Sequence, residues 1–591
     1  MSENVTRIFD IPAFQLANFP KEDAFMSKID GKWQGYSTAA FMEAVNDCSK
    51  GLLKIGIERG DKIAMISNNR PEWNIMDIAI LQVGAINVPI YPTISESDYQ
   101  YIFNDATIKV CIVSDEELLE KVHHIQKNVP TLKDIYSFNS IAGTKNWTEI
   151  RDLGKDSSME QVEAIKASIK DTDLATLIYT SGTTGTPKGV MLSHRNIVSN
   201  SKASAERLPV DFNSKALSFL PICHVYERMV LYLYMLNGTS VYFAESMETI
   251  GDNLREVKPE VFTAVPRLLE KVYDKIVTKG SDLTGIKKML FYWALNLGLE
   301  YDVVGKGAFY KLQLGLARKI IFSKWREALG GNVKAVASGS AALQPRLARV
   351  FLAAGIPVME GYGLTESSPV ISVNCEENDG VRIGTVGRII DGVEVKFAED
   401  GEIWARGPNI MMGYYNKPEQ TREVLDDEGW LHTGDIGELV EGQYLKITDR
   451  KKEIFKTSGG KYIAPQQVEN KFKESRFIEQ VMVVGENQKH PSALIVPAFE
   501  FLREWCKRKG LDCTTPSDIA SHEGVHKKLS EEIDHLNQSF GKWEQIKKFT
   551  LIPEEWTVEG GQMTPTLKLK RRFISKKYAA EIADFYPDSF L

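Results

Sequence analysis

Between Gly56 and Thr180 the chain alternates short apolar runs with longer mixed segments, and this alternation limits the possible fold more than any other feature. The apolar runs that we expect to form buried strands are Lys62–Ser67, Ile86–Pro92, Lys109–Asp115 and Leu174–Thr180. The segments between them, 71–85, 95–106 and 116–129, have the character of helices, the first opened by a proline and the second by a serine. Strands separated by helices pair in parallel, so the pattern predicts an α/β protein with doubly wound sheets covered by helices on both faces.

The pattern changes at Val381, where apolar and polar residues begin to alternate. A turn at Glu399–Gly401 separates two strand-like runs, as in a hairpin. We interpret 381–447 as a β-rich subdomain of a large N-terminal domain that covers residues 1–448. A charged, glycine-containing stretch follows, and we expect a small α+β domain over 449–591.

Composition excludes several classes of protein. The 591 residues are 43% hydrophobic and 26% charged, which is a globular balance and fits several domains. The net charge of -7 gives no indication of nucleic-acid binding. Six cysteines are scattered without a CxxC pair, which argues against a disulfide scaffold or zinc site and favours a reducing cytoplasm. No signal peptide and no apolar run of about 20 residues is evident, so at most a peripheral membrane contact is expected.

The loop after the last predicted strand has the composition of an anion-binding loop. "TSGTTGTPKG", from Thr180 to Gly189, holds three glycines, four threonines and one lysine. It is not a Walker-type loop, because Pro187 stands where that motif has the glycine before the lysine. Backbone N–H groups freed by glycine, hydroxyl donors and the charge of Lys188 still suit a phosphate. A polar surface loop is the alternative interpretation.

Four more stretches follow in a fixed order. They are "EGYGLTESSP" (360–369), "GWLHTGDIGEL" (429–439), "ITDRKKEIFKTSGGKYIAPQQVE" (447–469) and "MTPTLKLKR" (563–571). Together with the loop they closely resemble the adenylate-forming superfamily, which includes acyl-CoA synthetases, firefly luciferase and the adenylation domains of peptide synthetases. The stretches "FLPICHVYERMV" (219–230) and "VFTAVPRLLEKVYDKI" (261–276), with a helical insertion over 277–329, are similar to the long-chain fatty acyl-CoA synthetase branch. Glu428 departs from the signature of that branch, which has Gly or Asp there.

The resemblance implies a two-step reaction that uses ATP, a fatty acid, coenzyme A and Mg²⁺. The carboxylate attacks the α-phosphate of ATP to give acyl-AMP and pyrophosphate, and the thiol of coenzyme A then displaces AMP. Negative charge develops on the phosphates in the first step, so positive charge and placed donors should supply most of the catalysis.

The resemblance also implies roles for individual residues of the large domain. Tyr362 would stack on adenine, Thr365 would donate to the α-phosphate, and Glu366 would bind Mg²⁺. Asp435 and Arg450 would bind the ribose. The nucleotide-binding set implied in this way is Thr180, Ser181, Gly182, Thr183, Thr184, Gly185, Thr186, Lys188, Gly361, Tyr362, Gly363, Thr365, Asp435 and Arg450. A loop aromatic, a capping Thr–Glu pair and an Asp in a turn are the structural alternatives.

The C-terminal domain would carry the residues that distinguish the two steps. Lys568 would bridge the substrate carboxylate and the α-phosphate, although Leu567 precedes it where many members have glycine, and Lys570 is a rival for the role. A solvated basic tail is the alternative, which suits Arg571 better. Asp449 would be the hinge about which this mobile domain turns, although an exposed linker looks the same. Gly459 and Gly460 would line the path of the coenzyme A thiol, or form a plain tight turn.

The acyl chain and the membrane raise separate questions. His224 and Tyr226 occupy positions beside the acyl channel of the family, and Gly339 and Ser340 are small enough to leave room for a narrow chain; tight packing is the alternative. Residues 281–329 hold eight Lys/Arg and four Asp/Glu, a net charge of +4. Such a stretch with apolar residues could rest on an anionic membrane or simply pack on its own domain.

We conclude from the sequence that the chain is a long-chain fatty acid–CoA ligase. The same chemistry on a medium-chain or aryl acid, or transfer to a carrier protein, stays open. A luciferase-like oxygenase has no positive support in the sequence. An atypical phosphotransferase and a nucleotide-binding scaffold without turnover are the alternatives from other classes. Chain-length preference and oligomeric state cannot be predicted from the sequence.

Overall fold

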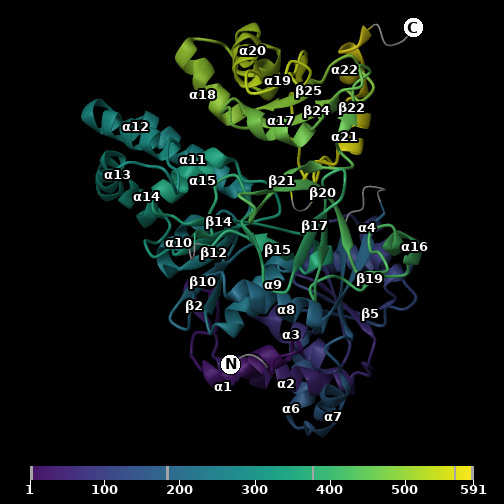
Figure 1. Ribbon diagram of the computed structural model, residues 1–591. Coiled ribbons are helices and arrows are strands. Elements are labelled where there is room, and N and C mark those ends of the chain that lie inside the picture. The colour runs from purple at the N-terminus through teal and green to yellow at the C-terminus, as the bar shows by residue number, and fades with distance from the viewer. Residues whose placement is uncertain (1–3, 181–185, 376–378, 565–566, 588–591) are drawn as a thin grey trace.

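The computed structural model describes residues 4–180, 186–375, 379–564 and 567–587. A large domain built on two long sheets holds the N-terminus, and a small domain lies above it at the C-terminal end of the chain (Figure 1). The mixed α/β class predicted from the sequence is confirmed. The division at 448 and 449 stays a prediction, and strand β21 (Tyr444–Arg450) runs across it.

The first long sheet contains the alternating segment. Its strand order is β19-β9-β8-β4-β3-β5-β6-β7. The strands are β3 (Lys62–Ile66), β4 (Ile86–Ile90), β5 (Ile108–Val113), β6 (Asp134–Ser137), β7 (Lys145–Asn146), β8 (Leu174–Thr180), β9 (Lys188–Ser193) and β19 (Gly413–Tyr414). The pairs from β8 to β7 are parallel, as predicted, while β9 and β19 add an antiparallel edge. Thr180 pairs with Lys188, so β8 and β9 run antiparallel on either side of the predicted phosphate loop.

Six helices of the described chain accompany the strands of this sheet. They are α2 (Thr38–Lys54), α3 (Pro71–Gln82), α4 (Glu96–Asp105), α5 (Glu116–Gln126), α6 (Trp147–Lys155) and α7 (Glu160–Ser168). The serine expected to cap α4 does so, since the Ser95 hydroxyl oxygen accepts from the Asp98 N–H at 3.2 Å. The predicted helices over 71–85, 95–106 and 116–129 are therefore confirmed as α3, α4 and α5.

The second long sheet has the order β16-β15-β14-β13-β12-β10-β11-β1-β2. Its strands are β1 (Phe25–Ile29), β2 (Lys32–Tyr36), β10 (Lys215–Ser218), β11 (Ser240–Phe243), β12 (Val261–Ala264), β13 (Ala335–Ser338), β14 (Val358–Gly363), β15 (Val370–Val373) and β16 (Arg388–Ile389). Helices α9 (Val225–Leu236), α10 (Ile250–Val257) and α15 (Pro345–Ala353) contact its strands, while α1 (Asp10–Asn18) and α8 (His194–Ala205) pack on α9.

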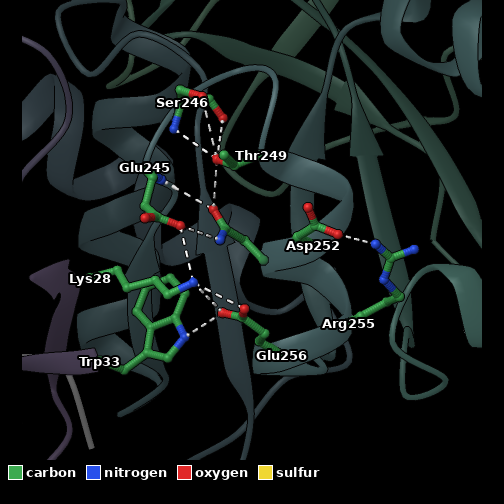
Figure 2. Close-up of polar contacts among 9 residues, drawn as sticks. Lys28, Trp33, Glu245, Ser246, Thr249, Asp252, Arg255 and Glu256 are labelled. Atoms are coloured by element: carbon green, nitrogen blue, oxygen red, sulfur yellow. Dashed lines mark hydrogen bonds and ion pairs between the residues drawn. The ribbon is translucent and has the colours of Figure 1, made fainter. Parts of the chain in front are cut away.

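Polar contacts fasten the N-terminal hairpin β1–β2 to α10 (Figure 2). The Lys28 ammonium lies 2.9 Å from Glu256 and 3.2 Å from Glu245, and the indole N–H of Trp33 donates to Glu256 at 3.1 Å. Asn253 donates to Glu245 at 3.0 Å, which ties α10 to the end of β11. The hairpin β1–β2, which forms one end of this sheet, is thus held by side-chain contacts as well as by backbone pairing.

Two helices buried on nearly all sides join the two sheets. Apart from Glu72 in α3 and Tyr226 in α9, every residue of these helices is buried, and Figure 1 shows both helices near the middle of the large domain. Arg228 of α9 contacts Asp77 of α3 with nitrogen and oxygen 2.6 Å apart. The side chains of this pair are 1% and 0% exposed. The ion pair therefore lies in the core, remote from water.

The β-rich region forms a separate antiparallel sheet in the order β17-β18-β20-β21. The strands are β17 (Glu394–Phe397), β18 (Glu402–Arg406), β20 (Leu431–Val440) and β21, with helix α16 (Pro418–Arg422) between β18 and β20. The predicted hairpin is confirmed, and its turn uses Gly401 with φ +81°. Not all of 381–447 belongs to this sheet, because β16 is a strand of the second long sheet and β19 is a strand of the first.

The small domain combines short sheets with helices. Its strands are β22 (Phe455–Lys456), β23 (Tyr462–Ile463), β24 (Ile478–Val484), β25 (Ser492–Pro497) and β26 (Phe549–Leu551). Its helices are α17 (Pro465–Phe472), α18 (Phe499–Lys509), α19 (Pro516–Ser521), α20 (Glu523–Asn537), α21 (Arg571–Lys577) and α22 (Ala579–Asp584). A separate apolar core fills this domain, around Phe472, Leu494 and Leu502.

The predicted helical insertion is also present. It begins within α11 (Pro266–Ser281) and continues with α12 (Gly285–Leu299), α13 (Ala308–Ile320) and α14 (Phe322–Ala328). Figure 1 shows α12 and α13 at one side of the molecule, away from the first long sheet. Among the described helices, none is both long and apolar enough to cross a membrane.

Candidate active site

One cavity of 2040 Å³ lies where the large domain, the β-rich sheet and the small domain meet. Its size exceeds that of a typical pocket for a single small ligand. The predicted residues that line it are Thr180, Lys188, His224, Tyr226, Gly339, Ser340, Gly361, Tyr362, Gly363, Thr365, Glu366, Asp435, Arg450 and Lys568. Predicted residues that are described but do not line it are Thr186, Asp449, Gly459 and Gly460. The loop residues Ser181, Gly182, Thr183, Thr184 and Gly185 lie outside the described residues.

Three strands bring together the residues expected to bind the nucleoside. Tyr362 is the penultimate residue of β14, and Asp435 of β20 pairs directly with Arg450 of β21. The Tyr362 hydroxyl donates to Asp435 Oδ2 at 2.7 Å, and Arg450 Nε lies 3.3 Å from Asp435 Oδ1. Burial raises the pKa of Asp435, and the charge of Arg450 opposes that rise. The carboxylate is therefore fixed in place by a phenol and a guanidinium.

Glu366 lies on a single 3-10 turn, Thr365–Ser367, which follows β14. Its Oε1 accepts from the Tyr414 hydroxyl at 2.8 Å. The Lys188 ammonium lies 4.9 Å from the centre of the Tyr414 ring, so Tyr414 contacts both this cation and the Glu366 carboxylate. Burial lowers the pKa of Lys188. Our sequence interpretation missed Tyr414, because β19 has only two residues and shows no periodicity.

Lys568 reaches this cavity from the small domain. A local turn positions it: Thr564 N–H donates to the Lys568 carbonyl at 2.8 Å, and Lys568 N–H donates to the Thr564 hydroxyl at 3.0 Å. Leu567 adopts φ +60°, a left-handed conformation that favours glycine. The Lys568 side chain lines the cavity and is exposed to the solvent within it.

The electrostatic surroundings of Lys568 come from both halves of the cavity. Burial lowers its pKa first and the nearby Arg450 guanidinium lowers it further, while Asp435 and Glu366 oppose this change. The pKa of His224 falls to about 4, mainly because of burial, and the charge of Lys568 contributes to that fall. Lys568 is thus close enough to interact electrostatically with the predicted nucleotide-binding residues and with His224 of the predicted acyl channel.

His224 and Tyr226 line the cavity at the start of α9. His224 caps α9, where its Nδ1 accepts from the Tyr226 N–H at 3.1 Å. A neutral imidazole that accepts at Nδ1 carries its proton on Nε2. A Cβ added at Gly339 would lie 3.4 Å from the Tyr226 ring, an ordinary contact, so Gly339 and Tyr226 are neighbours in the cavity wall. His224 is therefore both a helix cap and a cavity residue.

The comparison with known families shows to which family the chain belongs. The model of the AMP-binding enzyme family matches residues 13–415, which is more than half of the chain, and the model of the AMP-binding enzyme C-terminal domain matches residues 452–589. The chain belongs to the AMP-binding enzyme family. The resemblance to the adenylate-forming superfamily is therefore confirmed, and this AMP-binding enzyme has relatives along almost its whole length.

Curated relatives point to one branch of that family. A long-chain-fatty-acid–CoA ligase of Mycobacterium bovis is 32% identical over 565 residues, which cover 94% of this chain and 93% of the relative. A long-chain-fatty-acid–CoA ligase of Xenopus laevis is 32% identical over 605 residues, covering 96% of this chain and 82% of the relative. These matches confirm the predicted long-chain acyl-CoA synthetase branch.

Solved structures share the fold at lower identity. The anthranilate CoA ligase AuaEII in complex with anthranoyl-AMP superposes with a TM-score of 0.74 at 18% identity, covering 97% of this chain and 98% of that one. The A domain of carboxylic acid reductase from Segniliparus rugosus, in complex with AMP and a co-purified carboxylic acid, gives 0.74 at 19% identity, with coverages of 99% and 94%. Both likenesses concern the fold alone.

Asp449 of this AMP-binding enzyme is buried, with 2% of its surface exposed, so the alternative of an exposed linker is wrong. Its Oδ1 accepts from the Arg450 N–H at 2.6 Å, but its Oδ2 has no hydrogen-bond partner among the described residues. Burial raises the pKa of Asp449 to about 7, against the effect of the Arg450 N–H, and the charges of Glu453 and Glu469 add to the rise. Its role as a hinge stays a prediction.

Arg571 is not a solvated tail residue. Its guanidinium donates twice to Glu469, at 2.7 and 2.6 Å, and once to Glu453 at 2.9 Å. A bidentate contact of this kind fixes the start of α21, and with it the turn that carries Lys568. This contact could not be predicted from local sequence, because the acidic partners lie 118 and 102 positions earlier in the chain.

Substituting Asp449 by asparagine should change how stability depends on pH. The folded carboxyl has a pKa of about 7, above the ordinary value of 3.8, so folding takes up a proton between these limits. The contribution of Asp449 to stability is full below pH 4 and is lost as pH rises through 7, by at most about 1.4 kcal/mol per pH unit. We expect Asp449→Asn to unfold at the wild-type temperature at pH 4 and at a higher temperature at pH 8. If the melting temperatures of Asp449→Asn and the wild type differ by the same amount at pH 4 and pH 8, the raised pKa assigned to Asp449 is wrong.

Proposed function

We propose that this enzyme is a long-chain fatty acid–CoA ligase that forms acyl-AMP from ATP and a fatty acid and then transfers the acyl group to coenzyme A. One observation carries the proposal: a lysine from the small domain, Lys568, meets Asp435, Glu366 and His224 in a single cavity. The long-chain ligases of Mycobacterium bovis and Xenopus laevis support the choice of substrate.

The nucleotide half of the cavity suits adenosine and three phosphates. Asp435 offers carboxylate oxygens to the ribose hydroxyls, and the Tyr362 ring offers a flat face to adenine. The Thr365 hydroxyl and the Lys188 ammonium supply a donor and a charge for the phosphates. Lys568 would neutralise charge between the substrate carboxylate and the α-phosphate as the new P–O bond forms and the bond to pyrophosphate breaks.

The acyl half of the cavity is apolar. Met229, Val230 and Leu233 of α9, the helix that His224 caps, line the cavity together with Leu208. This side of the cavity can bury an alkyl chain by the hydrophobic effect. Neutral His224 would place its Nε2 proton at the boundary between this half and the phosphates.

Glu366 is the residue that we propose for Mg²⁺. Tyr414 occupies only one of its two carboxylate oxygens. No group of three or more His, Cys, Asp or Glu suited to a metal occurs within the described residues. A single carboxylate fits Mg²⁺ well, because this ion is usually held by one or two carboxylates together with substrate phosphates. The bound ion would supply charge that stabilises the triphosphate.

The second step would require a different face of the small domain. With Lys568 in the cavity, Gly459 and Gly460 lie in an exposed turn between β22 and β23 that does not line it. The segment that carries Lys568 and the turn that carries Gly459 and Gly460 cannot both lie beside the α-phosphate in this arrangement. The arrangement therefore suits acyl-AMP formation, and rotation near Asp449 would bring the glycine turn to the cavity for coenzyme A.

Exchange of labelled pyrophosphate into ATP tests the proposed function. We expect exchange only when a fatty acid is present, since acyl-AMP formation is reversible and needs the carboxylate. A phosphotransferase would not show this dependence. Failure to release AMP with any acid of the panel would favour a nucleotide-binding scaffold.

AMP release with a saturated series of acids, in the presence of coenzyme A, tests the substrate class. We expect the rate to be highest with long chains. A maximum with medium-chain or aryl acids, or turnover only when a carrier protein replaces coenzyme A, would instead support one of the two alternatives within the family.

A further inference from the structure

An apolar stripe runs along the outer face of α13. It consists of Phe309, Leu312, Leu316 and Ile320, which we call the α13 stripe. Their spacing of three and four residues places them on one side of the helix. Their exposed fractions are 73, 74, 53 and 37%. Four large apolar side chains in water along one helix mark an interaction surface rather than isolated surface residues.

The stripe is not the face by which α13 packs on the enzyme. The buried face contains Leu314 and Ala317, which are 5% and 0% exposed. On the same side, the Tyr310 hydroxyl donates to the Leu297 carbonyl of α12 at 2.6 Å. The inner face thus holds the helix, and the α13 stripe needs another explanation.

Apolar side chains are also exposed near the α13 stripe, in α12 and in the loop that follows it. Ile286 and Met289, near the start of α12, are 71% and 63% exposed. Val304, in the loop between the two helices, is 53% exposed. Figure 1 places α12 and α13 together at one side of the molecule. Exposed apolar residues therefore occur throughout this part of the insertion.

Charge indicates what covers the stripe. Residues 303–326 contain six Lys/Arg and no Asp/Glu, in a chain whose net charge is -7. Arg318 and Arg326 are used internally, because they donate to backbone carbonyls of Ala353 and Ala354 at 2.8 and 2.6 Å. Lys311 and Lys319 flank the α13 stripe, are exposed, and form no ion pair within the described part of the chain.

From these observations we infer that α13 docks this enzyme on the surface of an anionic lipid bilayer. The α13 stripe enters the boundary between headgroups and acyl chains, and Lys311 and Lys319 contact the acidic headgroups. A helix that is apolar on one side and basic at its margins has the form expected for such a peripheral contact. This inference goes beyond the proposed function and does not rest on it.

Co-sedimentation with lipid vesicles tests the inference without any substrate. We expect the wild-type protein to bind vesicles that contain phosphatidylglycerol more tightly than vesicles of phosphatidylcholine alone, and to lose binding as salt rises. In the double variant Leu312→Asp/Leu316→Asp, binding should fall about tenfold or more, because both charges would have to enter the apolar layer.

A matched variant controls for the general effect of adding acid to an exposed leucine. Leu153 of α6 is 52% exposed and belongs to a different part of the large domain. We expect Leu153→Asp to bind vesicles as the wild type does, and all the variants to keep the wild-type melting temperature because the changed side chains face water.

Three results would overturn the inference. The wild-type protein could fail to bind anionic vesicles, the double variant could bind them undiminished, or Leu153→Asp could lose as much binding. Light scattering of the eluted protein distinguishes self-association. If the double variant converts a dimer to a monomer without changing vesicle binding, the stripe is a contact between two copies of this chain.

Discussion

Replacing Lys568 with alanine should abolish acyl-AMP formation and leave the second half-reaction intact. Alanine removes the ammonium group together with the alkyl stem that carries it into the cavity. We propose that this ammonium bridges the substrate carboxylate and the α-phosphate while acyl-AMP forms, and that it leaves the cavity when the small domain turns for the second step. Loss of one such group from a preorganised site lowers the rate by about 10²–10³-fold or more. Pyrophosphate exchange measures the first half-reaction, and conversion of supplied acyl-AMP and coenzyme A to thioester measures the second.

Lys570→Ala is the matched control, because the same type of side chain lies two positions further on. Its backbone N–H donates to the Gln562 carbonyl at 2.8 Å, and its side chain is exposed and lines the same cavity as Lys568. We expect both half-reactions to stay near the wild-type rate in this variant. Equal loss of both half-reactions in Lys568→Ala, or a larger loss of exchange in Lys570→Ala, would reject the role assigned to Lys568.

Local sequence signals predicted the scaffold well. The alternation that begins at Lys62 requires neither long-range contacts nor ligands, because a four-to-seven-residue apolar run and a capped helix each form from neighbouring residues. Hence β3, α3, β4 and α4 appear within a few residues of their predicted bounds. The antiparallel edge formed by β9 was not predicted, since the hairpin depends on how the chain turns after Thr180.

The site was predicted by resemblance rather than by local pattern. Motifs separated by more than a hundred residues, such as those around Tyr362 and Lys568, do converge on one cavity. The partners that position them were missed, because a single tyrosine such as Tyr414 or a basic residue such as Arg571 has no distinctive neighbours in the sequence. Burial of Asp449 was missed for the same reason, as the surrounding charged residues look like those of an exposed linker.

The buried ion pair shows most clearly how a contact between distant elements escapes sequence reasoning. Asp77 Oδ1 accepts from Arg228 and from Asn87, each at 2.6 Å, and Oδ2 accepts from the Tyr232 hydroxyl. Arg228 also donates to Thr176 of β8 at 2.7 Å. Three polar groups, two from α9 and one from β4, thus depend on one carboxylate of α3.

We therefore expect Asp77→Ala to destabilise the large domain by about 3–5 kcal/mol, the usual cost of leaving one member of a buried ion pair without its partner. Arg228 is 1% exposed and cannot turn to water without disrupting α9. Asp171→Ala is the matched control: it removes the partner of Arg195 in a pair whose side chains are 31% and 51% exposed, so a loss of at most about 1 kcal/mol is expected. Urea-induced unfolding followed by tryptophan fluorescence measures both. Similar losses in the two variants would mean that the pair linking α3 to α9 contributes no more than a surface contact, and that apolar packing alone joins the two sheets.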